Sequence, residues 1–455
     1  MSMARTAKKE KALTPEEKLA QALVPDVEQP YRVPENWCWV KWGNVGEFVA
    51  GSGFKNEYQG FTEYEIPFYK VGSLKNSDTH GFIYDNSNTI NEEIRLKLKA
   101  NIIPPYSVLF AKIGEAIKLN RRSINEIACC IDNNMMAFIP KCLMRYAFYW
   151  TCGVDLYEYA NATTVPAIRK SDLEMIPFPL APLAEQQRIV DRIESLFAKL
   201  DEAKEKAQIV VDGFEDRRAA ILHKAFTGEL TEEWRSTHGV SIDEWENAPL
   251  ETVFQLRSGS TINASEEQEY GAIPYVKVAD MNLPENEIQI TTSSRFVDNC
   301  PESHVIPKGS TIFPKRGGAI LTNKKRYVGV EKIIADLNTM AIIPIAGRAY
   351  GWYGYYWMQS VDLRQLNNGS NVPQINNKDM VKLFVPTPST DEQKVIVGIL
   401  DSIFEKEIET KESTEQVIDQ IDTMKKSILA RAFRCELGTN DPADESAVEL
   451  LKRVL

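Results

Sequence analysis

Two short segments of this chain concentrate lysine and arginine in a way that suits contact with a polyanion. From Arg95 to Arg122 there are seven basic residues and one acidic residue, Glu115, and from Lys308 to Arg326 there are six basic residues and no acidic one. Lys and Arg neutralise phosphates and reach guanine edges, and an Asn side chain pairs with adenine. Because the chain as a whole carries a formal charge of −11, the two segments are local basic islands on an acidic protein.

The two islands share one arrangement. In each, a lysine ends an apolar, strand-like run just ahead of a glycine, and an Asn followed by basic residues comes several positions later. A single charged run is usually a solvated surface, but its recurrence at equivalent places favours a binding site. The sequence therefore predicts DNA contacts from Lys112, Lys118, Asn120, Arg121, Arg122, Lys315, Arg316, Asn323, Lys324, Lys325 and Arg326.

Other chemistry has weaker support. The stretch from Ile103 to Tyr106 reads Ile-Pro-Pro-Tyr, but Ile103 stands where amino-methyltransferases with a Pro-Pro-Tyr motif need Asn, Asp or Ser to accept hydrogen bonds from the target amino group. The four histidines lack metal-ligand spacing, and the seven cysteines form no C-x-x-C pair. We therefore predict no catalytic residue, no metal site and no cofactor bound by this chain.

Long amphipathic helices must position the islands. From Ile189 onward, apolar residues recur at alternating steps of four and three, which is a heptad pattern. The sequence predicts one unbroken helix from Pro182 to Leu230 and a second from Asp391 to Arg434. The predicted seam residues are Ile189, Ile193, Leu196, Leu200, Ala203, Ala207, Val210 and Phe214 in the first helix, and Ile396, Leu400, Ile403, Val417, Ile421, Met424 and Ile428 in the second.

The second helix repeats the first at an offset of 207 residues. The pair Glu185-Gln186 returns as Glu392-Gln393, and residues 161–230 align without gaps against residues 368–437. The similarity continues, with changing offsets, into the preceding segments, which are rich in short β-like runs. We conclude that the chain is a tandem duplication and that the basic islands are equivalent sites on two copies of one domain.

The order domain, helix, domain, helix predicts the geometry. Each helix of about 40 residues is roughly 60 Å long, and the second buries its seam best by running back along the first. The expected fold class is α+β, with two strand-rich globular domains joined by two long antiparallel coiled-coil helices and an internal pseudo-two-fold repeat. Within the coil, Ala203 and Ala207 are expected to meet Thr410 and Thr414. The predicted segments are an N-terminal arm (1–30), a first strand-rich domain (31–181), a first long helix (182–230), a polar linker (231–248), a second strand-rich domain (249–388), a second long helix (389–437) and a tail with a short helix (438–455).

Two aromatic stretches, around Tyr146 and Tyr353, occupy matching places in the two copies. Their spacings of three and four favour a helix packed on the domain core over a base-stacking platform. No apolar run approaches the ~18 residues of a membrane span, and the basic start, residues 1–11, is expected to be a disordered arm. Scattered cysteines of odd number fit a reducing compartment, so we expect a cytoplasmic protein.

Short motifs recur in the same order in both copies. They are the runs Val165-Pro166-Ala167-Ile168 and Val372-Pro373-Gln374-Ile375, the Glu-Gln pairs at the helix starts, and the helix exits at 224–230 and 431–437. A single opening motif, Val33-Pro34-Glu35-Asn36-Trp37, precedes them. In these motifs, from about residue 31 to residue 455, the chain resembles the specificity (S) subunits of type I restriction-modification enzymes. One departure is Cys435 where the first copy has Gly228, which leaves open whether the second helix ends in the same way.

The resemblance implies a function. It implies two target recognition domains that each read one half of a split sequence in double-stranded DNA, with the coiled coil setting the spacer and docking two modification (methyltransferase) subunits. It also implies that the chain itself is non-catalytic. Methylation of adenine with S-adenosylmethionine would come from the modification subunits, and ATP-dependent translocation and cleavage from restriction subunits.

Two alternatives stay open at this point. A self-sufficient DNA methyltransferase or nuclease would need a cofactor-binding fingerprint and a catalytic motif, and the sequence offers neither. A coiled-coil scaffold whose end domains bind protein would need no DNA contacts. Replacing Arg121, Arg122, Lys324 and Lys325 should separate the scaffold from the DNA-recognition hypothesis, because only the latter predicts a loss of DNA binding.

Overall fold

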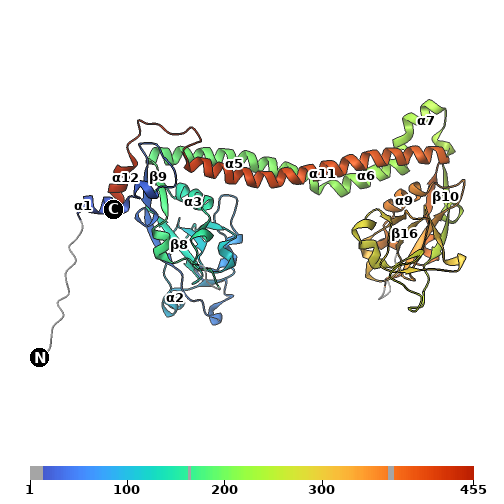
Figure 1. Ribbon diagram of the computed structural model, residues 1–455, viewed down its shortest axis with the longest axis horizontal. Coiled ribbons are helices and arrows are strands. Elements are labelled where there is room, and N and C mark those ends of the chain that lie inside the picture. Colours follow the sequence, from blue (N-terminus) through green and yellow to red (C-terminus); the bar gives the residue numbers. More distant parts are fainter. Residues whose placement is uncertain (1–13, 162–164, 367–372) are drawn as a thin grey trace. The chain divides into compact units, whose positions relative to one another are not determined.

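The computed structural model describes residues 14–161, 165–366 and 373–455. The predicted disordered arm, residues 1–11, lies outside these ranges. The chain forms two compact units, one made of residues 1–206 with 417–455 and the other of residues 207–416. Each unit contains one strand-rich domain and a pair of long helical segments (Figure 1).

The domain of the first unit is built on an antiparallel four-stranded sheet in the order β2-β8-β5-β6. These strands span Gly46–Ala50, Met135–Pro140, Val108–Ala111 and Arg122–Ile124, respectively. A three-stranded sheet in the order β4 (Thr89–Ile90), β3 (Ile66–Tyr69), β7 (Cys130–Ile131) and an antiparallel pair of β1 (Cys38–Lys41) and β9 (Pro177–Leu180) complete it. The predicted strand-rich domain is confirmed, with its aromatic core centred on the fully buried Trp42.

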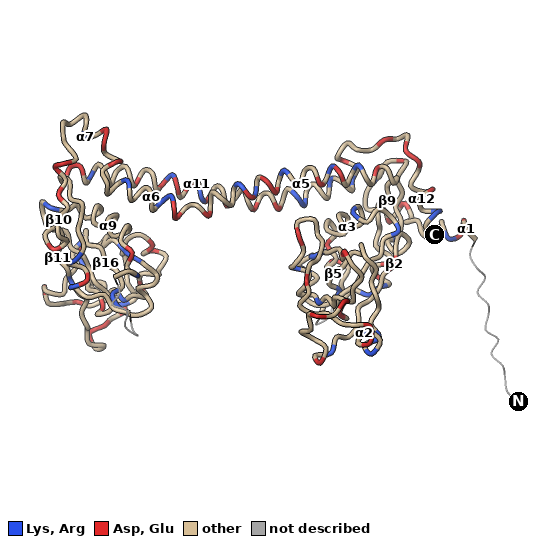
Figure 2. Tube along the Cα trace, turned by 180° about the vertical axis from the view of Figure 1, so that it is seen from behind, with Lys and Arg blue, Asp and Glu red and all other residues tan. Residues whose placement is uncertain are grey.

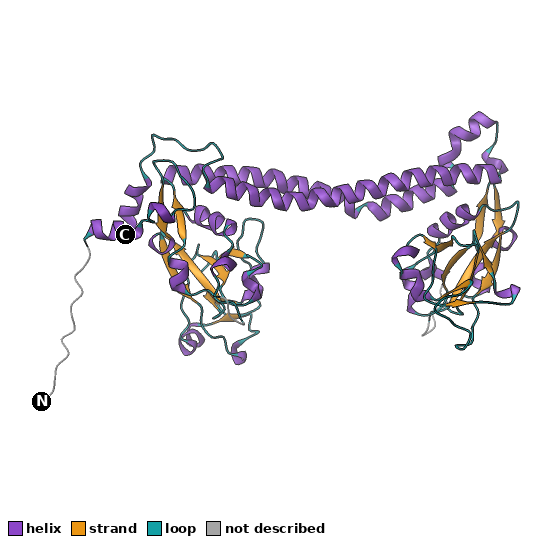
Figure 3. Cartoon of the chain, in the orientation of Figure 1, coloured by secondary structure: helices purple, strands orange, loops and turns teal. Residues whose placement is uncertain are grey.

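The domain of the second unit repeats this plan (Figure 3). Its larger sheet has the order β11-β19-β16-β17-β13, and a second sheet has the order β14-β12-β18-β15. The strands of these sheets are Phe254–Ser258, Thr339–Pro344, Thr311–Pro314, Arg326–Val328 and Gln289–Ile290, then Phe296–Val297, Ile273–Val276, Lys332–Ala335 and Ile306–Pro307. The strand pair β10 (Glu246–Pro249) and β20 (Phe384–Thr387) corresponds to β1 and β9.

The two aromatic stretches form helices α3 (Met144–Gly153) and α9 (Gly351–Ser360). Tyr146 and Tyr353 are fully buried, and each hydroxyl donates to a main-chain oxygen 2.6 Å away, that of Pro179 or of Pro386. The prediction of a core-packing helix in place of an exposed stacking platform is confirmed.

The first long helix is not unbroken, contrary to the prediction. It consists of α5 (Leu183–Asp212) and α6 (Phe214–Phe226), separated by Gly213 with ψ near 0°. Glycine is the residue least able to hold a helical conformation without tertiary support, apart from proline. The second helix is continuous as α11, Thr390–Phe433, close to its predicted limits.

Ion pairs between the helices fix their direction within each unit. In the first unit Asp201 pairs with Lys425 at 2.5 Å and Lys204 with Asp422 at 2.8 Å. In the second unit Arg217 of α6 pairs with Glu407 at 2.9 Å. As the residue number rises along α5 and α6, the number of the paired residue on α11 falls. The segments are therefore antiparallel, as predicted.

The register of this pairing differs from the predicted one. Lys204 faces Asp422, so its neighbour Ala203 lies far along α11 from Thr410 and Thr414. The hydroxyls of these two threonines donate to main-chain oxygens of their own helix. The repeat identifies the partner helices, but it does not specify which turns of them meet.

The seam prediction is correct only in part. Ile189, Ile193, Phe214, Ile396, Leu400 and Ile421 are buried. In contrast, Ala203 is exposed, and Val210, Val417 and Met424 are 36%, 44% and 49% exposed. The remaining predicted seam residues are partly buried: Leu196, Leu200, Ala207, Ile403 and Ile428.

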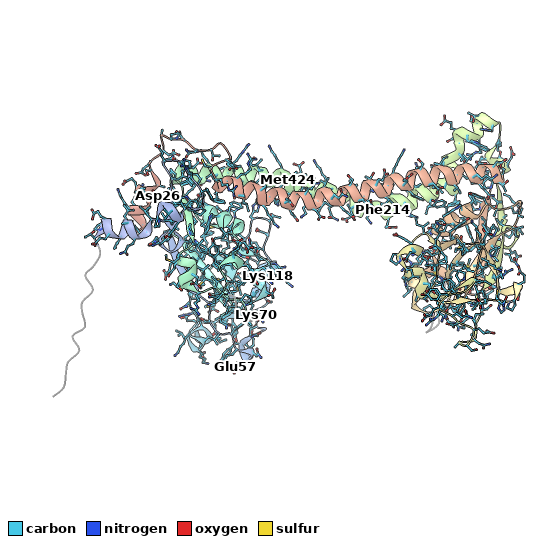
Figure 4. All side chains as sticks on the ribbon, viewed as in Figure 1. Asp26, Glu57, Lys70, Lys118, Phe214 and Met424 are labelled. Carbon is cyan, nitrogen blue, oxygen red and sulfur yellow. The ribbon has the colours of Figure 1, made fainter. Side chains whose placement is uncertain are left out.

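Lys425 explains why the buried face of α11 differs from the predicted seam. Its ammonium lies over the ring of Phe197, 5.0 Å from the centroid, and pairs with Asp201. Long cationic side chains can bury their aliphatic stems while keeping the charge at the surface. Lys425 therefore takes the inward position that the apolar pattern assigned to Met424, which points to solvent on α11 (Figure 4).

The repeated Glu-Gln pairs attach each helix start to its domain. Gln186 accepts from the amide of Leu143 at 3.0 Å and donates to the carbonyl of Ala181 at 2.8 Å. Gln393 makes the matching bonds with the amide of Tyr350 and the carbonyl of Pro388. Each glutamine thus ties α3 or α9 to the beginning of a long helix.

Glu392 shows that residues 231–248 are not a simple polar linker. Its buried carboxylate accepts from Thr231 at 2.7 Å, Arg235 at 2.8 Å and Trp245 at 3.0 Å. The intervening segment forms helix α7, Glu232–His238, and then enters β10. The predicted linker is therefore an ordered part of the second unit, because it supplies the partners of a buried charge.

Glu185 is the counterpart in the first unit, and its partners come from the tail. Its carboxylate accepts from Thr439 at 2.6 Å and from Arg188 at 3.0 Å, and burial raises the pKa of Glu185. Beyond Thr439 the tail forms α12, Ala447–Val454, which confirms the predicted short helix. Cys435 adopts the left-handed conformation with φ 60°, and Gly228 does so with φ 85°, so the residues that follow both long helices turn in the same way.

Candidate nucleic-acid interface

Two of the predicted DNA-contacting side chains lie inside their domains. Arg122 is 7% exposed, and its guanidinium donates to the carbonyls of Thr151 at 3.1 Å and Val154 at 3.4 Å, at the end of α3. Lys325 is 1% exposed, and its ammonium donates to the carbonyl of Val361, which follows α9, at 2.6 Å. Both cations occupy the negative end of a helix dipole, where positive charge is favoured.

Burial disfavours the charged form of both side chains. Burial lowers the pKa of Arg122 to about 10 and that of Lys325 to about 7. Arg122 donates to four oxygens of its own domain and Lys325 to two, so each charge is compensated internally. The geometry therefore assigns Arg122 and Lys325 to the architecture of the domain.

The two asparagines belong to the same internal networks. Asn120 and Asn323 have φ of 49° and 53°, the left-handed region that Asn tolerates better than most residues. The side-chain oxygen of Asn120 accepts from Arg122 at 2.6 Å, and that of Asn323 accepts from Lys325 at 2.8 Å. Asn323 also accepts from the amide of Leu363 at 2.9 Å. Their amide oxygens are thus used within the fold.

Exposed basic side chains remain beside these buried ones. Arg121 and Arg316 are exposed, and neither side chain forms a hydrogen bond or ion pair with the part of the chain that the structure describes. Lys118 is also exposed but pairs with Glu115 at 2.8 Å and lies over the ring of Tyr157.

Lys324 and Arg326 border a groove of about 640 Å³ between the second domain and the helices of its own unit. Lys324 bonds to the side chain of Asn282, and Arg326 donates to the carbonyl of Met281 at 3.2 Å. Arg218 and Lys411 add positive charge from the helices, whereas acidic side chains on the same lining, including Glu287 and Glu415, offset it. The basic side of this groove is the edge that carries Lys324 and Arg326.

The last two predicted residues, Lys112 and Lys315, are half-buried at the ends of β5 and β16. The carboxylate that attracts each of them, that of Asp132 or Asp336, is also attracted by a second half-buried lysine that the prediction missed, Lys70 or Lys277. The signal was present in the sequence, because both domains contain the same Ile-Pro-x-x-Lys-Val run. The run was interpreted only as a β-strand, and its lysine was therefore not predicted as a site residue.

Charge elsewhere is mixed. Lys and Arg alternate with Asp and Glu over both domains and along the helices (Figure 2). Within residues 14–161, 165–366 and 373–455, the His, Cys, Asp and Glu side chains form no group of three or more that could hold a metal ion. In the same ranges, no helix has the length and apolarity that crossing a membrane requires.

Comparison with known proteins identifies the duplicated domain. The family model of the type I restriction modification DNA specificity domain matches residues 34–210 and, a second time, residues 242–420. The chain belongs to this family. The two matches coincide with the two copies found from the repeat, each comprising a strand-rich domain and a large part of the long helix that follows it.

Relatives of the specificity family cover most of the chain. The specificity subunit of the type I restriction enzyme EcoKI from Escherichia coli K12 is 22% identical, covering 93% of this chain and 96% of that protein. The MjaVIII specificity subunit from Methanocaldococcus jannaschii is 25% identical over 88% and 92% of the two chains. The EcoDI specificity subunit from Escherichia coli is 24% identical over 65% of this chain and 72% of its own length.

Solved structures support the fold of the specificity chain. The crystal structure of the HsdS subunit from Thermoanaerobacter tengcongensis is 18% identical, with a TM-score of 0.61, over 90% of this chain and all of that one. A chain from a study of complex assembly and conformational transition of the type I R-M system has a TM-score of 0.64 at 17% identity, with the same coverage. The α+β architecture predicted from the repeat is confirmed at the level of the fold.

Proposed function

We propose that this chain is the DNA-specificity subunit of a type I restriction-modification complex. Each strand-rich domain, residues 31–181 and 249–388, would read one half of a bipartite target in double-stranded DNA. The observation that carries the proposal is the double match to the DNA specificity domain, aligned with two copies that each present basic side chains at equivalent places.

The structure narrows the side chains that we propose to face DNA. Arg121, Lys118 and Lys324, together with Arg316 and Arg326, have atoms at the surface and suit contacts with phosphates or guanine edges. We exclude Arg122, Lys325, Asn120 and Asn323 from direct contact, because their donors and acceptors bind carbonyls and amides of the same domain. They would instead hold the exposed neighbours in place.

We propose that the chemistry resides on partner subunits. Two modification subunits with S-adenosylmethionine would methylate adenine, and restriction subunits with ATP would translocate and cleave DNA. The long helices would set the spacer between half-sites and present the charged outer face on which partners dock.

The proposal is tested by mapping methylated adenines in DNA from cells that carry this chain and its modification subunit. The expected result is one bipartite, asymmetric motif. Exchanging residues 31–181 for the corresponding domain of a relative should change one half-site and keep the other. Methylation by the purified chain alone with S-adenosylmethionine, or a motif without two separated halves, would contradict it.

A further inference from the structure

We propose that each strand-rich domain contains a built-in site for a phosphate of the DNA backbone, formed by Lys70 and Lys112 in the first domain and by Lys277 and Lys315 in the second. This inference rests on the proposed function and deepens it. It assigns to these lysines the task of fixing the register of the domain on the duplex, leaving base reading to other side chains.

The backbone holds the two lysines at the strand ends in the same way. The amide of Lys112 donates to the carbonyl of Asn134 at 2.8 Å, and its carbonyl accepts from Ile168 at 2.9 Å. Lys315 makes the corresponding bonds with Asn338 at 2.8 Å and Ile375 at 2.9 Å. The residues Ile168 and Ile375 end the repeated Val-Pro-x-Ile motifs, so these motifs serve to position the lysines.

A shared aspartate brings the second lysine of each site close. The amide of Asp132 donates to the carbonyl of Tyr69, the residue before Lys70, and the amide of Asp336 donates to the carbonyl of Val276, the residue before Lys277. In Figure 4, Lys70 lies on the same flank of the first domain as Lys118. Asp132 therefore interacts electrostatically with both Lys70 and Lys112, and Asp336 with both Lys277 and Lys315. The two ammonium groups outnumber the one carboxylate at the first site, whereas at the second site the carboxylate of Glu267 offsets the second ammonium group.

The lysines at the strand ends have no hydrogen-bond acceptor of their own. Within the described ranges, neither the Lys112 nor the Lys315 side chain forms a hydrogen bond or an ion pair, although both are half-buried. Burial lowers the pKa of both lysines and raises the pKa of Asp132 and Asp336. Native proteins seldom leave a partly desolvated charge without a partner at two equivalent places, and an anion would supply the missing acceptor.

A glycine two residues after each of these lysines leaves the approach open. Gly114 has φ 78° and ψ −170°, and Gly317 has φ 74° and ψ −168°, a region that is essentially restricted to glycine. Among the residues that the structure describes, and apart from the two chain neighbours, no heavy atom lies within 4 Å of the position that a Cβ atom would take at either glycine. The described part of the domain therefore leaves space for a ligand beside each glycine, two residues from the lysine.

The two sites differ in one neighbour, which provides a test. The ammonium of Lys70 donates to the neutral amide of Gln59 at 2.9 Å, whereas Lys277 pairs with the carboxylate of Glu267 at 2.6 Å. Glu267 reduces the positive balance of the second site. We therefore expect the first domain to hold its phosphate more tightly than the second.

The experiment measures the affinity of the chain, assembled with its modification subunits, for a duplex that carries the mapped target, as a function of salt. K112Q and K315Q should each weaken binding several-fold and reduce the slope of log K against log salt by about 0.9, the value for one lost phosphate contact. Binding to unrelated duplex should weaken by a similar factor, and the methylated motif should not change. K97Q and K308Q, at surface ion pairs outside the sites, serve as controls and should leave the slope unchanged.

Charge exchange provides a second, independent readout. Q59E should weaken DNA binding and reduce the slope of log K against log salt, whereas E267Q should strengthen binding and increase that slope. Neither variant should change the methylated motif. Because the Lys112 side chain forms no hydrogen bond or ion pair with the described residues, K112Q should not lower the melting temperature. Unchanged salt slopes in K112Q and K315Q, or salt slopes that change in the same direction in Q59E and E267Q, would overturn the phosphate site. The bipartite motif would then still support the proposed function. Absence of a bipartite motif in the wild-type complex would instead overturn the proposed function itself.

Discussion

The Nζ atom of Lys325 lies 2.6 Å from the carbonyl oxygen of Val361, the residue that follows α9. The first domain has Arg122 in the same role, bonded to the carbonyls of Thr151 and Val154 at the end of α3. In each basic run, one cation is therefore directed inward to a helix terminus and its neighbour is directed outward. The two cations thus lie in different environments although they are adjacent in sequence.

Substitution should separate the two roles. R122Q should lower the free energy of unfolding by about 2–4 kcal/mol, because carbonyls buried against the guanidinium lose their donors. R121Q changes an exposed side chain and should alter stability by less than about 0.5 kcal/mol, but it should weaken DNA binding by the assembled complex. Chemical denaturation and DNA-binding titrations on both variants measure the contrast. Equal effects of the two variants on stability would contradict the assignment.

Lys325 should make stability depend on pH. Burial lowers its pKa from the ordinary value of 10.5 to about 7, so between these values the unfolded chain binds a proton that the folded chain lacks. The free energy of unfolding should therefore rise from pH 7 to pH 10.5, by at most about 1.4 kcal/mol per pH unit from this group. Below pH 7 its contribution is constant.

The measurement compares wild type with K325M by denaturation at several pH values from 7 to 10. The difference between the two curves isolates Lys325, because all other groups titrate in both proteins. K324M, at the less buried neighbouring position, should follow the wild-type curve. Parallel curves for wild type and K325M would refute the assignment.

The basic runs also show how far the sequence predicts the site. Repetition correctly identifies equivalent segments, but charge alone does not distinguish Arg121 from Arg122. The inward direction of Arg122 depends on carbonyls about thirty residues later, at the end of α3, and no local pattern encodes that proximity. Lys70 and Lys277 were missed for a related reason, since their significance comes from aspartates brought beside them by β3–β7 and β12–β18 pairing.

The fold was predictable where the signal is periodic or repeated. The 3.5-residue period and the offset of 207 residues predict the two long helices and their direction. They do not predict the register, since the repeat does not specify which turns of the helices meet. They also do not predict which face of α11 is buried, because Lys425 enters the seam in place of Met424 through its contacts with Phe197 and Asp201. A long side chain that packs its aliphatic stem inward and exposes its charge is counted as polar in a heptad pattern.

Removing the charge of Glu392 should destabilise the second unit. Its side chain is 1% exposed and pairs with Arg235, which is 8% exposed, at 2.8 Å. E392Q leaves a buried guanidinium without its counter-charge, and such losses cost about 3–5 kcal/mol. The combined variant E392Q/R235M should recover part of this loss, which denaturation of both variants would measure.

The repeat supplies a matched control for Glu392. Glu185 occupies the equivalent helix start, but its partner Arg188 is 36% exposed and also pairs with Asp444. E185Q should therefore cost less than E392Q, since Arg188 keeps water and a second carboxylate. A larger loss in E185Q than in E392Q would contradict the argument from burial.

Replacing Gly213 or Gly228 by alanine should change the free energy of unfolding in opposite directions. Gly213 separates α5 from α6 with φ −76°, which any residue can adopt, and its amide and carbonyl still bond to Ile209 and Arg217 at 3.0 Å. A Cβ atom there would lie 2.9 Å from Nη1 of Arg217 and 3.2 Å from the carbonyl oxygen of Ile209. The exposed hydrogen bond from this Nη1 to the carbonyl of Val210 must shift, whereas the pair of Arg217 Nε with Glu407 can stay. G213A should raise the free energy of unfolding by about 0.5–1 kcal/mol, because alanine loses less backbone entropy than glycine.

G228A is the control, because the same change meets a different backbone. Gly228 has φ 85°, and a Cβ atom would lie 2.5 Å from the Cδ1 atom of Ile242. The left-handed conformation alone costs an alanine about 1–2 kcal/mol, so G228A should lower stability by at least that amount. Thermal unfolding of both variants measures the difference. A loss of stability in G213A would mean that the break between α5 and α6 depends on the absence of a side chain, and not on a lower helix propensity at that position.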